Sequence, residues 1–320
     1  MTVAKPALLE ARDLRKNFPA RDGSGSVHAV SGVSLTLWPG ETLGIVGESG
    51  SGKSTLARLL LRLIEPTSGT TLFAGSDLGA LDSRRLRVLR RDMQIVFQDP
   101  YASLDPRMTV ADIIAEPLVI HGLGGRSERR KKVEECLRLV GLDIEAARRY
   151  PHEFSGGQRQ RIGIARAIAL EPKLVILDEP VSALDVSIQS QILNLLMELK
   201  QRLGLSYIFI SHDLSVVEHV SDRVAVMYLG RIVETAPADA LFETPLHPYT
   251  EALISAIPGD SESRSRIVLK GDPPSPQNPP AGCHYHPRCH KAFARCAFDV
   301  PQVVKLTEEG ITRSVTCHLY

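Results

Sequence analysis

The feature that most constrains this sequence is a glycine-rich segment placed directly after an apolar run. The apolar run is Thr42–Val46, and residues 47–54 then read Gly-Glu-Ser-Gly-Ser-Gly-Lys-Ser. Glycines let the backbone curl so that successive N–H groups point inward at phosphate oxygens, and a helix that begins near Lys53 adds its positive dipole end. Lys53 supplies a charge to the β and γ phosphates, and Ser54 offers a hydroxyl to Mg²⁺. The pattern predicts a phosphate-binding loop that comprises Gly47, Glu48, Ser49, Gly50, Ser51, Gly52, Lys53, Ser54 and Thr55.

Apolar runs and helical patterns alternate along most of the chain. Apolar runs without polar alternation are typical of strands buried on both faces, and apolar residues at helical spacing predict helices. The predicted strands are 42–46, 93–97, 174–177 and 207–210, and the predicted helices are 53–64, 128–140, 158–170 and 188–203. Residues 1–38 favour short strands and turns, about 100–170 is mainly helical, and 223–234 favours an antiparallel hairpin. The alternation predicts an α/β fold with a mostly parallel core sheet.

Composition and charge exclude several classes of protein. Of the 320 residues, 38 are Lys or Arg and 37 are Asp or Glu, and the resulting net charge of +1 gives no sign of a nucleic-acid binder. Basic clusters at 84–91 and 126–132 are interpreted as solvated helix faces. No apolar segment is long enough to span a bilayer, and Met1–Lys16 lacks a signal-peptide core. We therefore expect a cytoplasmic protein that meets a membrane only through partners.

Four of the five cysteines lie in the last 40 residues, after a Ser-, Pro- and Gly-rich stretch at 259–280 that is interpreted as a linker. In a reducing compartment such clustering indicates a metal site more than disulfides. Spacing alone does not choose between zinc and an iron–sulfur cluster, and free thiols are the remaining alternative. The candidate ligands are Cys283, Cys289, Cys296 and Cys317, and for zinc also His284, His286, His290 and His318. The fifth cysteine, Cys136, lies on the apolar face of a predicted helix and is assigned to the core.

Several segments downstream of the phosphate loop resemble the motifs of ATP-binding-cassette (ABC) ATPases. Phe154–Gln160, which reads Phe-Ser-Gly-Gly-Gln-Arg-Gln, resembles the signature loop, and Leu174–Leu177 followed by Asp178-Glu179-Pro180 resembles the Walker B strand. Ser182-Ala183-Leu184-Asp185 is similar to the D-loop, Ser211-His212-Asp213 to the switch histidine and Gln98 to the Q-loop. The resemblance covers residues 8 to about 258. It implies an ABC-type P-loop NTPase with an antiparallel β subdomain and a helical subdomain at about 100–170.

The positions of these residues favour specific roles. Asp178 ends a buried strand, where a carboxylate can hold Mg²⁺, and Glu179 is one residue further out, where it can take a proton from the attacking water. The resemblance implies that His212 contacts the γ-phosphate and that Gln98 reaches Mg²⁺ and the water. It also implies that Phe18 stacks on adenine, where a core phenylalanine is the alternative.

The signature loop implies a second subunit. Ser155, Gly156 and Gly157 precede the helix that starts at Gln158, which makes another N-terminal anion site. In ABC ATPases this loop closes over ATP held by the partner, with the D-loop residue Asp185 nearby. The resemblance therefore implies a head-to-tail dimer with two ATP molecules between the subunits.

Two further segments resemble the peptide-importer branch of the family. They are Gln98–Pro106 and Leu246–Leu253, and the second contains the His-Pro-Tyr element that opens the C-terminal extension of that branch. The branch carries a four-iron, four-sulfur cluster on its cysteines, which implies that cluster rather than zinc at the four late cysteines. The domains expected are an ATPase domain at 1–258 and a cysteine-rich extension at 259–320.

The resemblance implies an ATPase that powers uptake of dipeptides or oligopeptides, of the second, F-type kind. Its implied partners are a second homologous ATPase subunit, two transmembrane permease subunits and an extracytoplasmic substrate-binding protein, which places it at the cytoplasmic face of the cell membrane. Importers of nickel and glutathione share these motifs and are the alternatives within transport. Soluble ABC ATPases of DNA repair carry long coiled coils, and no sustained heptads occur here.

Overall fold

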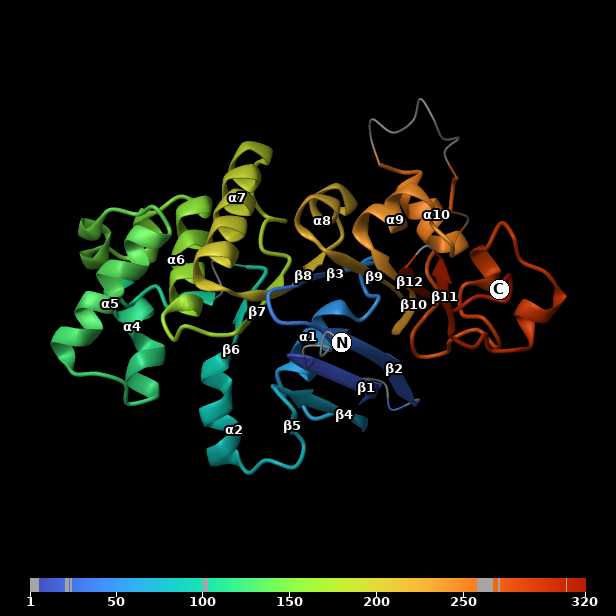
Figure 1. Cartoon of the computed structure of the whole chain (residues 1–320), viewed down its shortest axis with the longest axis horizontal. Coiled ribbons are helices and arrows are strands. Elements are labelled where there is room, and N and C mark those ends of the chain that lie inside the picture. Colours follow the sequence, from blue (N-terminus) through green and yellow to red (C-terminus); the bar gives the residue numbers. More distant parts are fainter. Residues whose placement is uncertain are drawn as a thin grey trace. The chain divides into compact units, whose positions relative to one another are not determined.

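The computed structural model describes residues 6–20, 23, 25–99, 103–257, 267–269, 271–308 and 310–320. Pro100, Tyr101 and Ala102 of the peptide-importer segment lie outside the described residues, as do residues 259–266 and 270 of the predicted linker. The chain forms two compact units (Figure 1). Unit 1 comprises Met1–Leu37, Thr42–Gly79 and Ile210–Tyr320, and unit 2 comprises Trp38–Glu41 and Ala80–Phe209.

Unit 1 begins with a small antiparallel sheet of strand order β2-β1-β4-β5. Its strands are β1 (Leu9–Pro19), β2 (Ser26–Leu37), β4 (Ser68–Phe73) and β5 (Ser76–Asp77). The pairing confirms the antiparallel β region, but β1 and β2 span 11 and 12 residues and are longer than the short strands predicted. Register shifts between Ala11 and Leu14 break the polar alternation of β1, so the sequence pattern understates its length.

In a second group of paired strands in unit 1, the strand before the phosphate loop pairs with the first strand of the predicted hairpin. Its strands run in the order β11-β12-β10-β9-β3. Their bounds are β3 (Thr42–Val46), β9 (Arg223–Tyr228), β10 (Arg231–Pro237), β11 (Val304–Glu308) and β12 (Ile311–Val315). Only β3 and β9 pair in parallel here, whereas β9–β10, β10–β12 and β11–β12 are antiparallel. This part of the sheet is therefore mixed rather than mostly parallel, because a C-terminal hairpin extends it.

Unit 1 also contains several short helices. They are α1 (Lys53–Leu60), α8 (Leu214–Val220), α9 (Ala238–Glu243) and α10 (Pro248–Ile254), with 3₁₀ turns η4 (His286–Arg288) and η5 (Ala294–Ala297). The helix α8 packs on β3, and α9 packs on β9 and β10 (Figure 1). The prediction for α1 was too long by four residues. The helix ends because Arg62 adopts a left-handed φ of 53°, and the N–H groups of both Leu63 and Ile64 then bond to the carbonyl of Arg58.

The C-terminal residues are fastened to unit 1 at a buried carboxylate. Glu234 on β10 is fully buried and accepts hydrogen bonds from the backbone N–H groups of Leu246 and His247, at 2.9 and 2.8 Å. Arg313 on β12 donates to the same carboxylate at 3.0 Å. The predicted linker also contacts β2, because the N–H of His28 donates to the carbonyl of Pro276. The C-terminal segment is thus continuous with the sheet that carries the phosphate loop.

Unit 2 contains three strands in the order β8-β7-β6 and most of the long helices. The strands are β6 (Met93–Val96), β7 (Leu174–Asp178) and β8 (Ser206–Ser211), whose last residues enter unit 1. The helices are α2 (Ser83–Leu89), α4 (Val110–Ile120), α5 (Arg126–Leu139), α6 (Gly156–Ile168) and α7 (Val186–Leu203), with 3₁₀ turns η1 (Arg90–Asp92), η2 (Ile144–Arg148) and η3 (Pro151–Glu153). β6 and β7 pair in parallel, as predicted for these mainly apolar segments.

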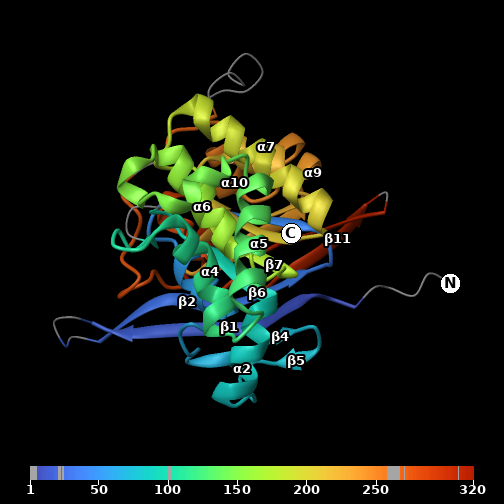
Figure 2. The same cartoon turned by 90° about the vertical axis from the view of Figure 1, so that its left-hand side faces the viewer.

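The helical region predicted at about 100–170 is confirmed in unit 2. The helices α4, α5 and α6 pack on one another (Figure 2). In α5, Cys136 is fully buried and burial raises the pKa of its thiol to about 12, which confirms it as a core residue. Gly141, with a φ of 69°, follows the helix end as expected of a C-terminal glycine. In the part of the chain that the structure describes, none of the helices has both the length and the apolar character of a membrane span.

Candidate functional site

The phosphate loop follows β3 and adopts a backbone that side chains would block. Gly47 and Gly52 have φ values of 155° and 102°, in the region where glycine is favoured. A Cβ atom at Gly47 would collide with the carbonyl oxygen of Met227, and one at Gly52 with that of Ala29. The loop is therefore pressed against two neighbouring strand ends, which fixes its curl.

Lys53 is the first residue of α1 and its charge is buried. Lys53 is 5% exposed, and its Nζ donates to the carbonyls of Gly47 and Glu48 at 2.7 and 3.0 Å. The N–H of Ser51 also donates to the Glu48 carbonyl. These bonds hold the ammonium group inside the curl of the loop, and its contact with phosphates stays a prediction.

Glu48 connects the loop to residues far away in the sequence. Its carboxylate accepts two hydrogen bonds from Arg288, and its N–H donates to the hydroxyl of Tyr249 at 3.0 Å. Tyr249 belongs to an aromatic cluster with Tyr228 and Tyr285, whose ring centroids lie 4.7 to 5.3 Å apart. Sequence reasoning missed Arg288, because a lone arginine between two cysteines carries no pattern that points to a loop 240 residues earlier.

Two other predicted residues of unit 1 are accessible to a ligand. His212 follows β8 and is exposed, and the next residue, Asp213, caps α8 by accepting hydrogen bonds from the N–H groups of Ser215 and Val216. Phe18 is 37% exposed, with the Nζ of Lys16 5.0 Å from its ring centroid. The alternative of a core phenylalanine is therefore wrong, and the stacking role stays a prediction.

In unit 2 the structure brings Gln98 and Glu179 together. The Nε2 of Gln98 donates to Oε2 of Glu179 at 2.9 Å. Asp178 ends β7 and is 4% exposed, whereas Glu179 is half-buried and has a left-handed φ of 50°. A non-glycine residue in that conformation stores strain of roughly 1 kcal/mol or more, which is common where a side chain must be aimed. The strand end thus presents two adjacent carboxylates in different environments.

The signature segment begins a helix through a reciprocal cap. Ser155 Oγ accepts from the N–H of Gln158 at 3.4 Å, and the Gln158 side chain accepts from the N–H of Ser155 at 3.1 Å. Gly157 is buried, and a Cβ there would overlap Ile188 of α7. Ser155 and Gln158 are exposed. Asp185 precedes α7, is exposed, and its side chain caps no N–H of that helix. Gly157 is thus packed closely against α7, whereas Ser155 and Gln158 are open to solvent.

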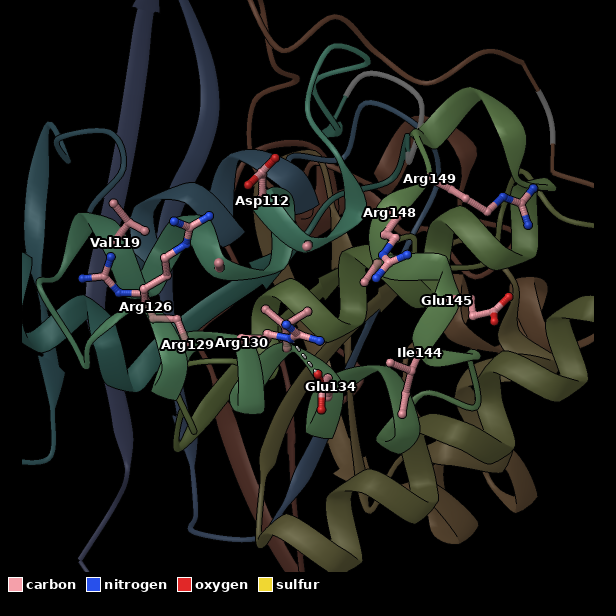
Figure 3. A pocket seen from close by; sticks show the side chains of 14 residues that line it. Asp112, Val119, Arg126, Arg129, Arg130, Glu134, Ile144, Glu145, Arg148 and Arg149 are labelled. Carbon is pink, nitrogen blue, oxygen red and sulfur yellow. Dashed lines mark hydrogen bonds and ion pairs between the residues drawn. The ribbon is translucent and has the colours of Figure 1, made fainter.

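A groove in unit 2 lies between α4, α5 and η2 (Figure 3). Its volume is about 980 Å³. It is lined by Ala111, Asp112, Ala115, Val119, Arg126, Arg129, Arg130, Val133, Glu134, Ile144, Glu145, Ala147, Arg148 and Arg149. Five of these residues are arginines and three are acids, so the lining has an excess of two positive charges. Part of the basic cluster at 126–132, interpreted as a solvated helix face, therefore faces a groove.

The four late cysteines line one small pocket in unit 1, together with His286 and His318. Burial is the main cause that raises the pKa of the Cys289 thiol, to about 11, and also those of Cys283 and Cys317. Among the residues that the structure describes, no group of three or more His, Cys, Asp or Glu side chains is arranged closely enough to hold a metal ion. The predicted convergence of the cysteines is observed, but the metal centre is not confirmed.

The two remaining histidines of the zinc alternative are engaged elsewhere. His290 lies 3.4 Å from the carboxylate of Glu251, and burial with the charge of Arg231 lowers the pKa of His284 to about 4. Neither lines the cysteine pocket. Of the four histidines predicted as zinc ligands, only His286 and His318 line the pocket.

Comparison with known proteins adds family matches in two parts of the chain. Residues 30–182 match the family described as ABC transporter, and residues 233–296 match the family described as oligopeptide/dipeptide transporter, C-terminal region. The oligopeptide transport ATP-binding protein AppF of Bacillus subtilis is 54% identical, and the alignment covers 100% of both chains. The probable peptide ABC transporter ATP-binding protein y4tS of Sinorhizobium fredii is 55% identical over 98% of this chain and 90% of the relative.

Solved structures show the same fold. The dimeric, post-hydrolysis structure of the ATP-binding cassette MJ0796 with ADP and Pi has 31% sequence identity and a TM-score of 0.65, and covers 72% of this chain and 98% of that one. The cbiO1 structure from Clostridium perfringens, part of the ABC transporter complex cbiONQ, has 31% identity and a TM-score of 0.66, over 75% of this chain and 92% of that one.

Proposed function

The chain belongs to the family of ABC-transporter ATP-binding proteins, and we propose that it powers the uptake of short peptides by hydrolysing ATP in a head-to-tail dimer. The observation that carries this proposal is the phosphate loop with its buried lysine, in a chain whose C-terminal region matches that of oligopeptide/dipeptide transporters. Relatives that share about half of its residues over 90 to 100% of their length are named as oligopeptide or peptide transport ATP-binding proteins.

The first step is binding of the triphosphate. The N–H groups of the curled loop and the ammonium of Lys53 would bind the β and γ phosphates, because both are hydrogen-bond donors and the phosphates are anionic acceptors. The hydroxyl of Ser54, the carboxylate of Asp178 and the amide oxygen of Gln98 are the proposed contacts of Mg²⁺, directly or through water. Phe18 offers an exposed ring for the adenine.

The second step is attack of water on the γ-phosphate. Glu179 is the proposed general base, and its carboxylate takes the proton that the water loses. The hydrogen bond from Gln98 fixes the position of one carboxylate oxygen of Glu179. His212 is the proposed donor to the γ-phosphate, where negative charge must be stabilised.

The third element is a partner subunit. Ser155, Gly156, Gly157 and Gln158, with Asp185, are proposed to close over ATP held by a second, homologous ATPase subunit. Their support is the exposed, capped N-terminus of α6, whose N–H groups attract anions. ATP favours closure because it contacts both subunits, and loss of the γ-phosphate weakens one set of contacts.

Glu179→Gln should separate binding from turnover. The amide keeps the shape and the hydrogen bond to Gln98 but cannot accept the proton, so ATP hydrolysis should fall by a factor of about 10² or more while Mg–ATP affinity stays within about twofold. Phosphate release and equilibrium binding measure the two quantities. Glu198→Gln, an equal change at an exposed site on α7, is the control and should leave both unchanged. Undiminished hydrolysis by Glu179→Gln would exclude Glu179 as the base.

Coupling to transport requires contact with membrane subunits, and the groove of unit 2 is the proposed place. Its lining includes the apolar residues Ala111, Ala115 and Val133, together with the five arginines that Figure 3 labels. A short amphipathic helix with acidic residues, supplied by a permease subunit, would complement both features. Membrane attachment at the cytoplasmic face would then come through these permease partners, which receive the peptide from an extracytoplasmic binding protein.

Reversal of one groove charge should weaken transport and spare the chemistry. Arg148→Glu replaces an exposed arginine of the groove, so peptide uptake by the assembled transporter should fall about fivefold or more through weaker docking. ATP hydrolysis by the separate chain should stay within about twofold. Arg202→Glu, at the exposed end of α7, is the matched control. Equal uptake by the two variants would place the permease contact elsewhere.

The four pocket cysteines are proposed to hold a four-iron, four-sulfur cluster, with zinc as the alternative. Support comes from four thiols on one pocket, since thiolates are ligands of both. Such a cluster would tie together segments of the C-terminal extension, the second of the two proposed domains (1–258 and 259–320). The cysteines would act as ligands, and the rest of the pocket would exclude water.

Metal analysis after anaerobic purification tests this assignment. We expect about four iron and four sulfide per chain, with visible absorbance that is lost in Cys289→Ser. Cys136→Ser, which changes a core cysteine outside the pocket, should keep the iron. Zinc without iron would show that the cysteines bind zinc instead of a cluster. If neither metal is found, the four thiols are free.

A further inference from the structure

Glu48, the second residue of the phosphate loop, accepts two hydrogen bonds from Arg288 of the C-terminal extension. Arg288 donates to Glu48 through both terminal nitrogens, with Nη1–Oε2 at 2.8 Å and Nη2–Oε1 at 3.0 Å. The side chain of Arg288 is 6% exposed and that of Glu48 24%. A two-bonded guanidinium–carboxylate pair with little solvent contact fixes the geometry of both partners. The conformation of Glu48 is therefore set from outside the loop.

Two main-chain atoms of Glu48 are fixed as well. Its N–H donates to the hydroxyl of Tyr249, and its carbonyl accepts from the ammonium of Lys53 at 3.0 Å. The ring of Tyr249 packs against that of Tyr285, with centroids 5.3 Å apart, and Tyr285 precedes Arg288 by three residues. One short segment of the extension thus supports the loop directly through Arg288 and indirectly through Tyr249.

Glu48 also poses an electrostatic problem for a loop that receives a triphosphate. A carboxylate beside bound phosphates repels them, and the repulsion is strong where solvent is largely excluded. Arg288 supplies the opposite charge at hydrogen-bond distance. A guanidinium stays charged throughout the physiological range, so this compensation does not depend on pH there.

We propose that Arg288 is a positioning residue for ATP binding, which neutralises and orients Glu48 so that the phosphate loop accepts the triphosphate. The C-terminal extension then sets the ATP affinity of the cassette, although Arg288 itself does not touch the nucleotide. This inference rests on the proposed function of the loop.

Direct titration of Mg–ATP into the full chain tests the role. Arg288→Met keeps much of the side-chain length but leaves the charge of Glu48 uncompensated, so the dissociation constant should rise about tenfold or more. Lys305→Met is the control, because it removes an exposed cation of the same extension from β11, and its dissociation constant should match that of the wild type. Failure of the wild type to bind Mg–ATP would contradict the proposed function, which is a different result.

A rescue variant separates charge from mere structural damage. Glu48→Gln combined with Arg288→Met removes both charges, so its dissociation constant should return to within about threefold of the wild type. The defect of Arg288→Met alone should also shrink as salt is raised, because salt screens repulsion between Glu48 and the phosphates. Damage to the loop fold would be neither rescued by Glu48→Gln nor relieved by salt, and either failure would overturn the proposal.

Arg288→Lys covers the case in which the methionine variant does not fold. Lysine keeps the charge but cannot make both hydrogen bonds, so the dissociation constant should rise about threefold. Wild-type affinity in Arg288→Met, or in Arg288→Lys if only that variant folds, would show that the pair does not position the loop.

Discussion

The phosphate loop depends on a backbone path that only glycine permits. At Gly47 and Gly52 the space for a side chain is taken by carbonyl groups of Met227 and Ala29, which belong to strands β9 and β2. Glycine at both positions therefore allows the loop to curl in close contact with these two strands. Burial of Lys53 follows from that curl, since its ammonium is enclosed by carbonyls of the same loop. An enclosed cation beside backbone N–H groups is the arrangement expected of a phosphate-binding loop.

The surroundings of the loop come from distant parts of the chain. β3 delivers the loop, β9 lies parallel to it, and β10 carries the buried Glu234 that anchors the C-terminal residues through Arg313. Arg288, in the same C-terminal region, donates a hydrogen bond to Glu48. The C-terminal residues thus contact β10 through the pair of Arg313 with Glu234, and the phosphate loop through the pair of Arg288 with Glu48.

Much of this arrangement could be predicted from the sequence, and the reason is local. The loop, β3 and the β9–β10 hairpin are each encoded by adjacent residues, as glycine spacing, an apolar run and a turn at Leu229-Gly230. The pairing of Gln98 with Glu179 also agrees with motifs that the family resemblance identified. Their catalytic roles, like those of Asp178 and His212, stay predictions.

Other features depend on contacts that no local pattern carries. The pairing of β12 with β10 joins residues about 80 positions apart, as in Glu234 with Val315, whereas the sequence predicted only a cysteine-rich extension there. The tyrosine cluster and Arg288 act through three-dimensional proximity as well. The early end of α1 was missed because a left-handed arginine has no sequence signature. The groove of unit 2 was read as a solvated face, since a single helix cannot reveal what lies opposite it.

The central claim is that the enclosed ammonium of Lys53 and the loop N–H groups bind a nucleotide triphosphate. Titration calorimetry of Mg–ATP against the full chain and against Lys53→Ala measures this most directly. Loss of one charged hydrogen-bond donor at the phosphates should weaken binding by roughly 10- to 100-fold. Equal affinity of the two proteins would show that the phosphates bind elsewhere and would contradict the account.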